Sequence, residues 1–446
     1  MGRPLEGVRL AGQRKQSLIN DETMDFSSTW SSEKISSVVG TPLHDVCGVE
    51  IDFQNRRQRR LAGAIGKTWG ADFNGILPWQ RRRCAVADDG EILACWGEPG
   101  FTDTGALTVA AAGKPAGTIA QTMVYQPKFY YRVEPVVLDG QHLRKARYFI
   151  SASPRPGFKL HPAFMRNGAR KDYVLIGAFE ACLQQGTAYN LTDAQTGDFT
   201  PGTGDRLASR AGAKPVSGLT QQFTRANART AAQNRGPGWT QLYAAIHCAT
   251  LMLMLVEFGG FNTQNAIGRG VVDLPSGTGN ESLNTGTTAS FGNSSGTAPG
   301  IDEQAPVSYR GQENPWGNIW EFVDGINMPA SGSREIFIAD HDFEEGVTTG
   351  RYVNAGIQGA ASNGFVSAFA HSEPFDWLFV PSETVGDSEL PVGDWFWQNW
   401  GAAGFRVAYA GGHWTNASLA GGFAVALSSA AANRSRHFGG RAVFVP

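Results

Sequence analysis

The stretch YRGQENPWGNIWEFVDGIN, residues 309–327, decides how this chain is interpreted. Pro315 suits the first turn of a helix, where its missing amide hydrogen costs nothing. Gly325 suits the residue that ends a helix. Together these positions predict a short helix over Trp316–Asp324.

Around this stretch lies a chain of 446 residues that is rich in glycine and low in charge. It holds 56 glycines and 12 tryptophans, and 17% of its residues are charged, below the roughly 25% usual in soluble domains. An aromatic content of 11% excludes wholesale disorder, because there is ample apolar surface to bury. The apolar run Leu251–Val256 is far shorter than the roughly 20 residues of a membrane helix, so no membrane insertion is expected. The basic N-terminus has no apolar run behind it and is not typical of a secretory signal.

The net charge of −2 hides an asymmetry between two parts of the chain. Residues 1–250 hold 30 basic and 21 acidic residues, whereas residues 251–446 hold 8 and 19. The two parts are therefore expected to face different partners or to face each other. Arginines cluster in residues 56–60 and 81–83, a pattern that nucleic-acid binding also uses. Because the whole chain is negative, we expect contact with an acidic domain or subunit and no nucleic-acid partner.

The cysteines predict neither a zinc site nor a disulfide framework. There are five, Cys47, Cys84, Cys95, Cys182 and Cys248, without a CxxC motif. Cys84 and Cys95 could face each other across a hairpin. Five scattered cysteines in a long chain are more often buried thiols, which suits assembly in a reducing cytoplasm.

Hydrophobic periodicity predicts an α+β protein in which a few helices buttress a loop-rich β domain. Alternation predicts strands and hairpins, and spacings of three and four predict helices. The expected hairpins span Val49–Leu61 and Arg81–Cys95, and further strands span Val124–Leu138 and Arg147–Ile150. The expected longer helices span Lys171–Leu183, Thr220–Asn234 and Trp239–Phe258; Asp273–Pro306 is expected to be a long surface loop. Glu257, near the end of the third helix, is expected to bond to backbone or to an arginine.

No motif predicts an enzyme, a cofactor or a metal. The chain lacks HExxH, and its one GxSxG match, Gly292–Gly296, lacks the strand and helix that a nucleophile elbow requires. The acidic residues around His341 lack the spacing of a calcium loop.

The C-terminal hundred residues carry the pattern most typical of ligand recognition. Tryptophan rings stack on sugar faces, while amides, imidazoles and guanidinium groups bond hydroxyls. Trp395, Trp397 and Trp400 could equally be core residues. The candidates after residue 410 are flanked by small polar residues, which favours their exposure. The candidate ligand-binding residues are Trp395, Trp397, Asn399, His413, Trp414, Asn416, Asn433, Arg434, Arg436 and His437.

Several motifs resemble a known family. Residues 309–327, and residues 375–382 (FDWLFVPS), resemble phage and prophage tail proteins with a C-type-lectin-like fold. The closing segment, with GGHW at 411–414 and GGR at 439–441, is similar to the end shared by formylglycine-generating enzymes and the variable proteins of diversity-generating retroelements. Residues 17–39 are similar to arms near the N-termini of tail-fibre and baseplate proteins.

The resemblance implies an N-terminal docking arm (1–40), a small β-rich domain (41–120) and a C-type-lectin-like domain (121–446) that presents its ligand through C-terminal strands and loops. No cysteine follows Cys248, so the copper-dependent thiol chemistry of the enzymatic branch is not expected. The sugar-binding tripeptides of calcium-dependent lectins are absent too, so any sugar binding would be metal-independent.

Three functions remain open at this stage. The first is a non-enzymatic, phage tail-associated receptor-binding protein, made in the host cytoplasm and carried on the virion. It would contact a glycan or protein on the host cell, attach to other tail or baseplate proteins through residues 1–40, and form a homo-oligomer, with a trimer expected. The second is a structural tail component that bridges its neighbours. The third is a glycan-cleaving enzyme, which would need paired carboxylates in a cleft.

Overall fold

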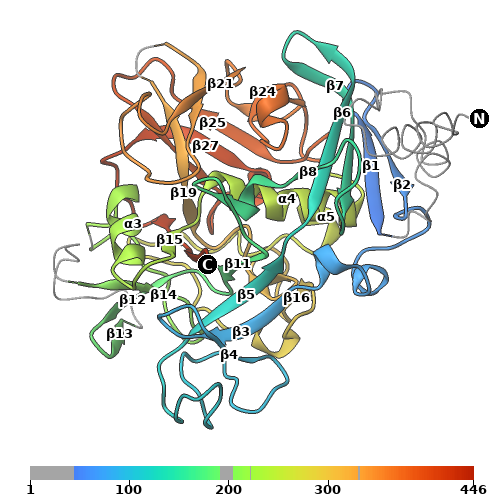
Figure 1. Cartoon of the computed structure of the whole chain (residues 1–446). Coiled ribbons are helices and arrows are strands. Elements are labelled where there is room, and N and C mark those ends of the chain that lie inside the picture. Colours follow the sequence, from blue (N-terminus) through green and yellow to red (C-terminus); the bar gives the residue numbers. More distant parts are fainter. Residues whose placement is uncertain (1–44, 191–203, 221, 330–331) are drawn as a thin grey trace, which may run out of the picture.

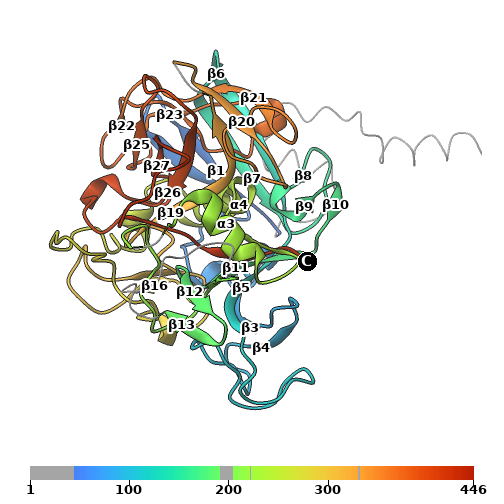
Figure 2. The same cartoon turned by 90° about the vertical axis from the view of Figure 1, so that its left-hand side faces the viewer.

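The computed structural model describes residues 45–190, 204–220, 222–329 and 332–446. The predicted docking arm, residues 1–40, lies outside the described residues. Strands make up most of the regular structure and helices are few (Figures 1 and 2). The mostly β structure agrees broadly with the predicted α+β class, whereas the finer C-type-lectin-like assignment stays a prediction.

Three larger sheets organise the described chain. The first has the order β2-β1-β7-β6-β8, and consists of β1 (Val46–Asp52), β2 (Arg57–Ala62), β6 (Tyr130–Asp139), β7 (His142–Ser151) and β8 (Lys159–Leu160). The second has the order β15-β29-β11-β5-β3-β4, and consists of β3 (Arg82–Val86), β4 (Ile92–Cys95), β5 (Gln121–Pro127), β11 (Tyr173–Gly177), β15 (Trp239–Gln241) and β29 (Ala442–Phe444).

The third sheet has the order β21-β20-β19-β26-β27-β25-β22, with β28 paired to β19. It consists of β19 (Trp320–Met328), β20 (Glu335–Ile338), β21 (Val353–Gln358), β22 (Gly364–Phe365), β25 (Trp395–Gln398), β26 (Arg406–Ala410), β27 (Val425–Ala430) and β28 (Phe438–Gly439). The smaller strands are β9 (Met165–Arg166), β10 (Ala169–Arg170), β12 (Cys182–Gln185), β13 (Ala188–Asn190), β14 (Arg206–Ala208), β16 (Gly296–Thr297), β17 (Val307–Tyr309), β18 (Gln312–Glu313), β23 (Ala368–Phe369) and β24 (Pro381–Glu383).

The helix α4 (Ala244–Phe258) lies at the centre of the molecule (Figure 1). It contacts β1 and β7 of the first sheet and β19 of the third. All but two of its side chains are buried, because its sequence is apolar around almost the whole circumference. The helix ends at Gly259, whose φ of 79° is left-handed. The other α-helices of the described residues are α3 (Arg225–Gln233) and the short α5 (Thr263–Ala266).

The buried Glu257 on the last turn of α4 is paired with an arginine, as predicted. Its carboxylate accepts hydrogen bonds from Nη2 and Nε of Arg310, at 2.6 and 2.7 Å, and from the Tyr309 hydroxyl at 2.9 Å. Arg310 and Tyr309 belong to the stretch quoted first. The ion pair therefore ties that stretch to the central helix.

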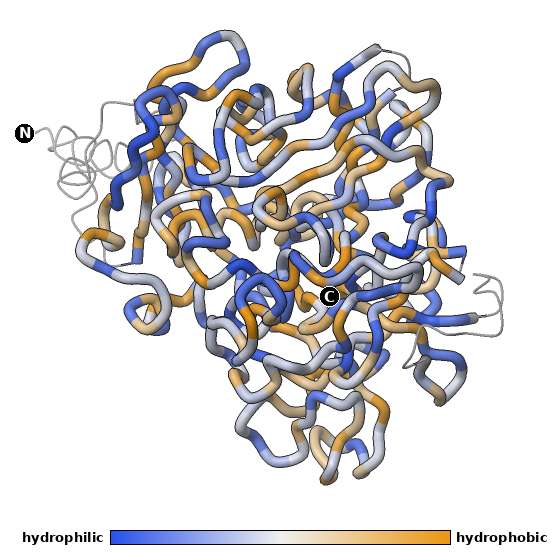
Figure 3. The backbone as a smooth tube through the Cα atoms, turned by 180° about the vertical axis from the view of Figure 1, so that it is seen from behind, coloured by the Kyte–Doolittle hydropathy of each residue, from blue (hydrophilic) through white to orange (hydrophobic). Residues whose placement is uncertain are grey.

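Strand predictions from alternation are confirmed. Val49–Leu61 forms the β1–β2 hairpin and Arg81–Cys95 forms the β3–β4 hairpin. Residues 124–138 contribute to β5 and β6, and residues 147–150 belong to β7. The hydrophilic edge strand β2 is the continuous blue run beside the grey N-terminal trace in Figure 3.

Two helix predictions are wrong, and two are correct only in part. Residues 171–183 form β11 and the start of β12, and residues 316–324 enter β19. All nine residues of β19 are buried, so the strand lacks the alternation that distinguishes a half-exposed strand from a helix. The third predicted helix begins at Ala244 instead of Trp239, because residues 239–241 form β15. The polar helix predicted from residue 220 begins at Arg225.

The predicted domain boundary at residue 120 does not separate two sheets. β1 pairs with β7 along its whole length, and β3 pairs with β5. Core residues from both sides of the boundary, such as Val49, Phe73 and Leu253, belong to one hydrophobic cluster. Residues 45–120 are thus an integral part of the main fold.

The predicted surface loop, residues 273–306, is partly buried. Ser282 and Thr288 are fully buried. The Glu313 carboxylate accepts hydrogen bonds from the Gly286 and Thr288 amides and from the Thr288 hydroxyl, each at 2.7 Å. A loop that satisfies a buried carboxylate has to lie against the core.

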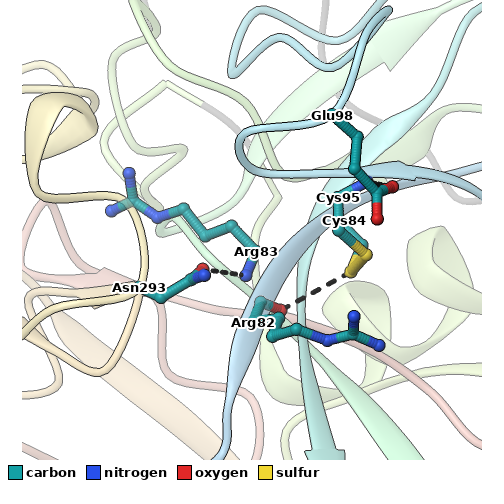
Figure 4. Close-up of a disulfide and its surroundings, with 6 residues drawn as sticks. All are labelled: Arg82, Arg83, Cys84, Cys95, Glu98 and Asn293. Atoms are coloured by element: carbon teal, nitrogen blue, oxygen red, sulfur yellow. Dashed lines mark hydrogen bonds between the residues drawn. A yellow bond between two sulfur atoms is a disulfide. The ribbon is translucent and has the colours of Figure 1, made fainter.

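The cysteine prediction is wrong for one pair. Cys84 and Cys95 are directly opposite each other on β3 and β4 and form a disulfide (Figure 4). Cys47, Cys182 and Cys248 are free and buried, as predicted.

The two oppositely charged parts of the chain face each other, which was one of the two alternatives. Arg229 of α3 contacts Asp324 of β19 and Glu345, in both cases at 2.6 Å. Arg144 of β7 pairs with Glu383 of β24, and Lys159 of β8 contacts Asp376 at 3.0 Å. The charge asymmetry is thus matched in part inside the molecule.

The strand pairing predicts that residues 121–446 do not fold alone. Removing β1 and β3 would leave β7 and β5 with unpaired edges and remove part of the shared core. Expression of residues 121–446 should give aggregated protein or a chain without a cooperative thermal transition. The matched control, residues 45–446, retains every described strand and should unfold cooperatively. A soluble 121–446 chain with a sharp transition would contradict this assignment.

Candidate ligand-binding site

An open hollow of about 190 Å³ lies on the third sheet, over neighbouring strands β19, β26, β27 and β25. We call it the aromatic hollow. Its lining residues are Trp320, Trp397, Tyr409, His413, Asn416, Ala426, Ser428, Ser435, His437 and Phe438.

Strand register creates this hollow. Ala426 of β27 is directly opposite Trp397 of β25 on one side and Tyr409 of β26 on the other. Residues directly opposite each other on neighbouring strands lie on the same face of a sheet. A small residue therefore stands between two large rings, and the methyl group of Ala426 leaves the space between them open. Ser428 also lines the hollow, next to an irregularity in the pairing of β26 with β27.

Edge-to-face contacts hold the two rings in place. Trp320 of β19 is nearly perpendicular to Trp397, with ring centroids 5.1 Å apart, and to Tyr409 at 5.0 Å. Tyr409 also packs on Phe438 at 4.6 Å, and its hydroxyl is 2.7 Å from the Ser428 hydroxyl oxygen. Aromatic pairs in this arrangement contribute about 0.5–1.5 kcal/mol each beyond the area they bury. The ring geometry is thus preset before any ligand arrives.

Two histidines from separate loops form another wall. The imidazole rings of His413 and His437 are 4.2 Å apart and tilted by 32°. Burial lowers the pKa of His413 to about 3 and that of His437 to about 4, and the nearby Arg436 acts in the same direction. Both rings are therefore neutral at pH 7, and each offers one hydrogen-bond donor and one acceptor.

Polar groups orient these loops. The Asn416 Oδ1 accepts a hydrogen bond from the His413 amide at 2.8 Å. The Ser435 hydroxyl is 3.2 Å from His437 Nδ1. Among the described residues that line the hollow, none is acidic and none is charged at neutral pH.

Four of the ten predicted site residues line the aromatic hollow: Trp397, His413, Asn416 and His437. Trp395 is half-buried beside it, with its ring 6.3 Å from that of Trp397, and it packs against Phe365 at 4.8 Å. Asn399, Asn433 and Arg434 are exposed but do not line the hollow.

Arg436 bonds to the protein itself. Its guanidinium donates to the backbone oxygens of Gly277 and Gly279, the latter at 3.1 Å, and lies 3.3 Å from the Ser276 hydroxyl. It also lies 6.0 Å from the ring of Trp414. These contacts connect the loop before β28 to residues 276–279.

Trp414 does not present its ring to a ligand, because its side chain is fully buried against Val271 and Ile319. Gly411 and Gly412 precede it with φ angles of 95° and 90°. A Cβ atom at residue 412 would lie 2.6 Å from the Cβ of Ala420, so glycine is required for this turn. The turn directs Trp414 inward. The small polar residues that follow Trp414 predict exposure instead, so its burial could not be predicted from the sequence.

Sequence reasoning missed six lining residues: Trp320, Tyr409, Ala426, Ser428, Ser435 and Phe438. Trp320 lies in the stretch for which the sequence predicts a helix. The placement of Tyr409 and Ala426 depends on the register between strands that are distant in sequence. In the sequence, only the two-residue spacing of Val407 and Tyr409, within a short apolar run, could have indicated a strand at this position.

Among the described residues, no helix is long and apolar enough to cross a membrane. The same residues contain no group of three or more His, Cys, Asp or Glu side chains that could hold a metal ion.

No protein-family model and no curated protein matches the chain. Solved structures similar to it include the Major Tropism Determinant U1, P3c and M1 variants. Each is 12% identical and covers 82% of this chain; the match spans 72%, 72% and 71% of the respective chains. The TM-scores are 0.29, 0.29 and 0.28, too low to show a shared fold.

Burial of Trp414 predicts that Trp414→Ala destabilises the whole protein. Removing a buried tryptophan costs roughly 3–5 kcal/mol, because the cavity cannot collapse fully. Chemical denaturation should show a loss of this size, whereas Trp395→Ala, at a half-buried position, should cost less than half as much. An unchanged unfolding midpoint in Trp414→Ala would show that the ring is not part of the core.

The lowered histidine pKa values predict that acid reduces stability. Between the unfolded pKa of about 6.5 and the folded values of about 3 and 4, the unfolded chain binds protons that the folded chain does not. The free energy of unfolding should therefore fall as pH drops from 7 to 5. The decrease should be smaller in His413→Gln. Equal pH dependence in both proteins, measured by urea unfolding at each pH, would contradict the neutral assignment.

Proposed function

We propose that this protein is a non-enzymatic, phage tail-associated receptor-binding protein, and that the aromatic hollow contacts the host cell surface. The observation that carries the proposal is the uncharged, ring-lined hollow on the third sheet. The family resemblance of residues 309–327 and of the closing segment supports the same function. Binding at this face also agrees with the expectation that the C-terminal strands and loops present the ligand.

The chemistry of the hollow favours a neutral ligand rich in hydroxyl groups. The half-buried Trp397 offers apolar ring surface, with Tyr409 packed below it, while His413, His437, Asn416 and Ser428 offer hydrogen-bonding groups without net charge. This combination suits a sugar ring, which has an apolar face and a polar edge. At about 30 Å³ per water, 190 Å³ holds roughly six waters, comparable to a single sugar residue.

A site this small and open supplies modest affinity by itself. Several copies on one particle would convert repeated weak contacts into strong attachment. The proposal therefore includes a homo-oligomer, with residues 1–40 attaching it to other tail or baseplate proteins. The proposal therefore places the protein on the virion.

The lining of the hollow favours binding over glycan cleavage. Glycoside hydrolysis ordinarily uses two carboxyl groups about 5–10 Å apart, one of them a general acid. The described lining residues include no carboxylate. Binding without turnover is accordingly the function that the hollow supports best.

Replacement of Trp397 by alanine tests this proposal. Trp397 is half-buried and its ring forms one wall of the hollow. A central aromatic contact is worth about 2 kcal/mol or more, so Trp397→Ala should weaken adsorption of the full-length protein to host cells at least tenfold. The matched control is Trp96→Ala, because Trp96 is 44% exposed and lies outside the hollow.

Thermal unfolding of each variant separates binding from folding. Both variants should keep the wild-type transition within a few degrees. The receptor-binding proposal would be overturned if particles that carry Trp397→Ala assemble normally and adsorb as well as wild-type particles. A structural role would then remain. Release of soluble sugars from host envelope polysaccharide by the purified protein would show an enzyme instead.

A further inference from the structure

A second and larger hollow, of about 510 Å³, lies beside β3 and β5, and we call it the arginine hollow. It shares no lining residue with the aromatic hollow. Its lining residues are Asn74, Leu77, Trp79, Gln80, Arg81, Arg82, Tyr125, Pro127, Asn293, Ser294 and Arg310. Three of these are arginines, and none is acidic among the residues that the structure describes.

Arg310 is already neutralised. Its guanidinium forms two short contacts with the Glu257 carboxylate and donates to Asn74 Oδ1 at 3.0 Å and to the backbone oxygens of Trp79 and Gly70, each at 2.9 Å. With its donors satisfied, Arg310 forms part of the wall and adds little net charge to the hollow.

Arg81 is a buried cation without an anionic partner. Its side chain is 2% exposed, and its Nη2 donates to Gln312 Oε1 at 2.8 Å. Its Nε and Nη1 have no hydrogen-bond partner among the described residues. The guanidinium also lies 5.3 Å from the ring of Tyr309.

Most other buried arginines of the described chain are paired with a carboxylate. Arg406 is the exception, but it donates to the backbone oxygens of Asn399 and Ala403. Arg229 contacts Asp324, Arg441 contacts Glu321, and Arg235 contacts Asp88, all at 2.6 Å. No carboxylate of the described chain lies within 4 Å of Arg81. A buried charge is costly unless it is paired, so the unpaired state of Arg81 points to a partner from outside.

The guanidinium stays charged at neutral pH. Burial lowers the pKa of Arg81 to about 10, which is still three units above pH 7. In surroundings of low dielectric constant, its field is weakly screened and extends into the hollow that it lines.

Arg82 supplies a second positive charge at the accessible side of the hollow. It is exposed, lies directly opposite Tyr125 of β5, and places its guanidinium 5.5 Å from the Tyr125 ring. Tyr125 in turn stacks on Tyr173 at 4.8 Å, which fixes its position. No ion pair of Arg82 occurs within the described part of the chain.

We propose that the arginine hollow binds a ligand that carries a carboxylate or phosphate group, with the anion between the charges of Arg81 and Arg82. Asn74, Gln80, Asn293 and Ser294 would bond the polar remainder of the ligand, and Tyr125 and Leu77 would contact its apolar surface. The arrangement suits an acidic saccharide or a free phosphate, which share the anionic group. A neutral sugar would leave both charges unmatched.

Titration calorimetry on the full-length protein at low salt tests the proposal. The probes are glucuronate, inorganic phosphate and uncharged glucose. Saturable binding of glucuronate alone would identify a carboxylated saccharide, and saturable binding of phosphate would identify the phosphate group. Either result supports the anion site, and raising the salt concentration should weaken the binding. No saturable binding of either anion, or equally tight binding of glucose, overturns it.

Variants connect the binding to the two arginines. Arg82→Ala changes an exposed side chain and should weaken anion binding at least tenfold. Arg81→Met removes the buried charge at similar volume, and its thermal transition should stay at or above that of the wild type. Arg57→Ala, at an exposed position on β2, is the matched control and should bind as the wild type does. Wild-type affinity in both Arg82→Ala and Arg81→Met overturns the proposal.

The proposals for the aromatic hollow and for the arginine hollow can be tested independently. Trp397→Ala, which changes the aromatic hollow, should leave anion binding unchanged. Loss of anion binding in Trp397→Ala with an unchanged thermal transition would place the anion in the aromatic hollow and overturn the assignment to Arg81 and Arg82.

Discussion

Burial of the helix α4 on all sides is the constraint on which the rest of the structure depends. Two sheets share this helix as part of one core, so neither sheet can shift without exposing apolar surface. The helix also carries Glu257, whose carboxylate is stable in the interior only when paired. Arg310 and Tyr309 satisfy it, and this places residues 309–327 against the core. The same stretch continues into β19, an interior strand of the third sheet.

The packing of β19 against the core keeps the aromatic hollow rigid. Trp320 at the start of β19 contacts both Trp397 and Tyr409, so the walls of the hollow rest on a strand that is buried throughout. Loops 411–416 and 431–437 then add histidines and amides. A preset apolar surface with adaptable polar groups is the usual composition of a recognition site.

Much of the local structure could be predicted, and less of the site. Alternation found the hairpin of Val49, because its apolar side chains alternate with Glu50 and Asp52, whose carboxylates pair with basic residues. The hairpin of Cys84 was recognisable from its Asp-Asp-Gly turn at residues 88–90. Alternation failed at residues 173–177 and 320–328, where both faces are buried and no period remains. Composition found Trp397 and both histidines. It could not find Tyr409 or Ala426, whose contribution depends on the register of β25, β27 and β26, nor the inward turn of Trp414.

The charge pairing across the molecule limits how such a chain can change by recombination. Arg144, Lys159 and Arg229 come from the first 250 residues, and the carboxylates that they contact come from the last 200 or so. A genetic exchange near the middle of the gene would join two halves from different parents. Basic side chains of one half would then lack their carboxylate partners in the other, and several buried ions would be unpaired. Point substitution in the loops around the hollow disturbs none of these pairs. Diversity in binding can therefore accumulate by small surface changes, while the two halves are inherited as a unit.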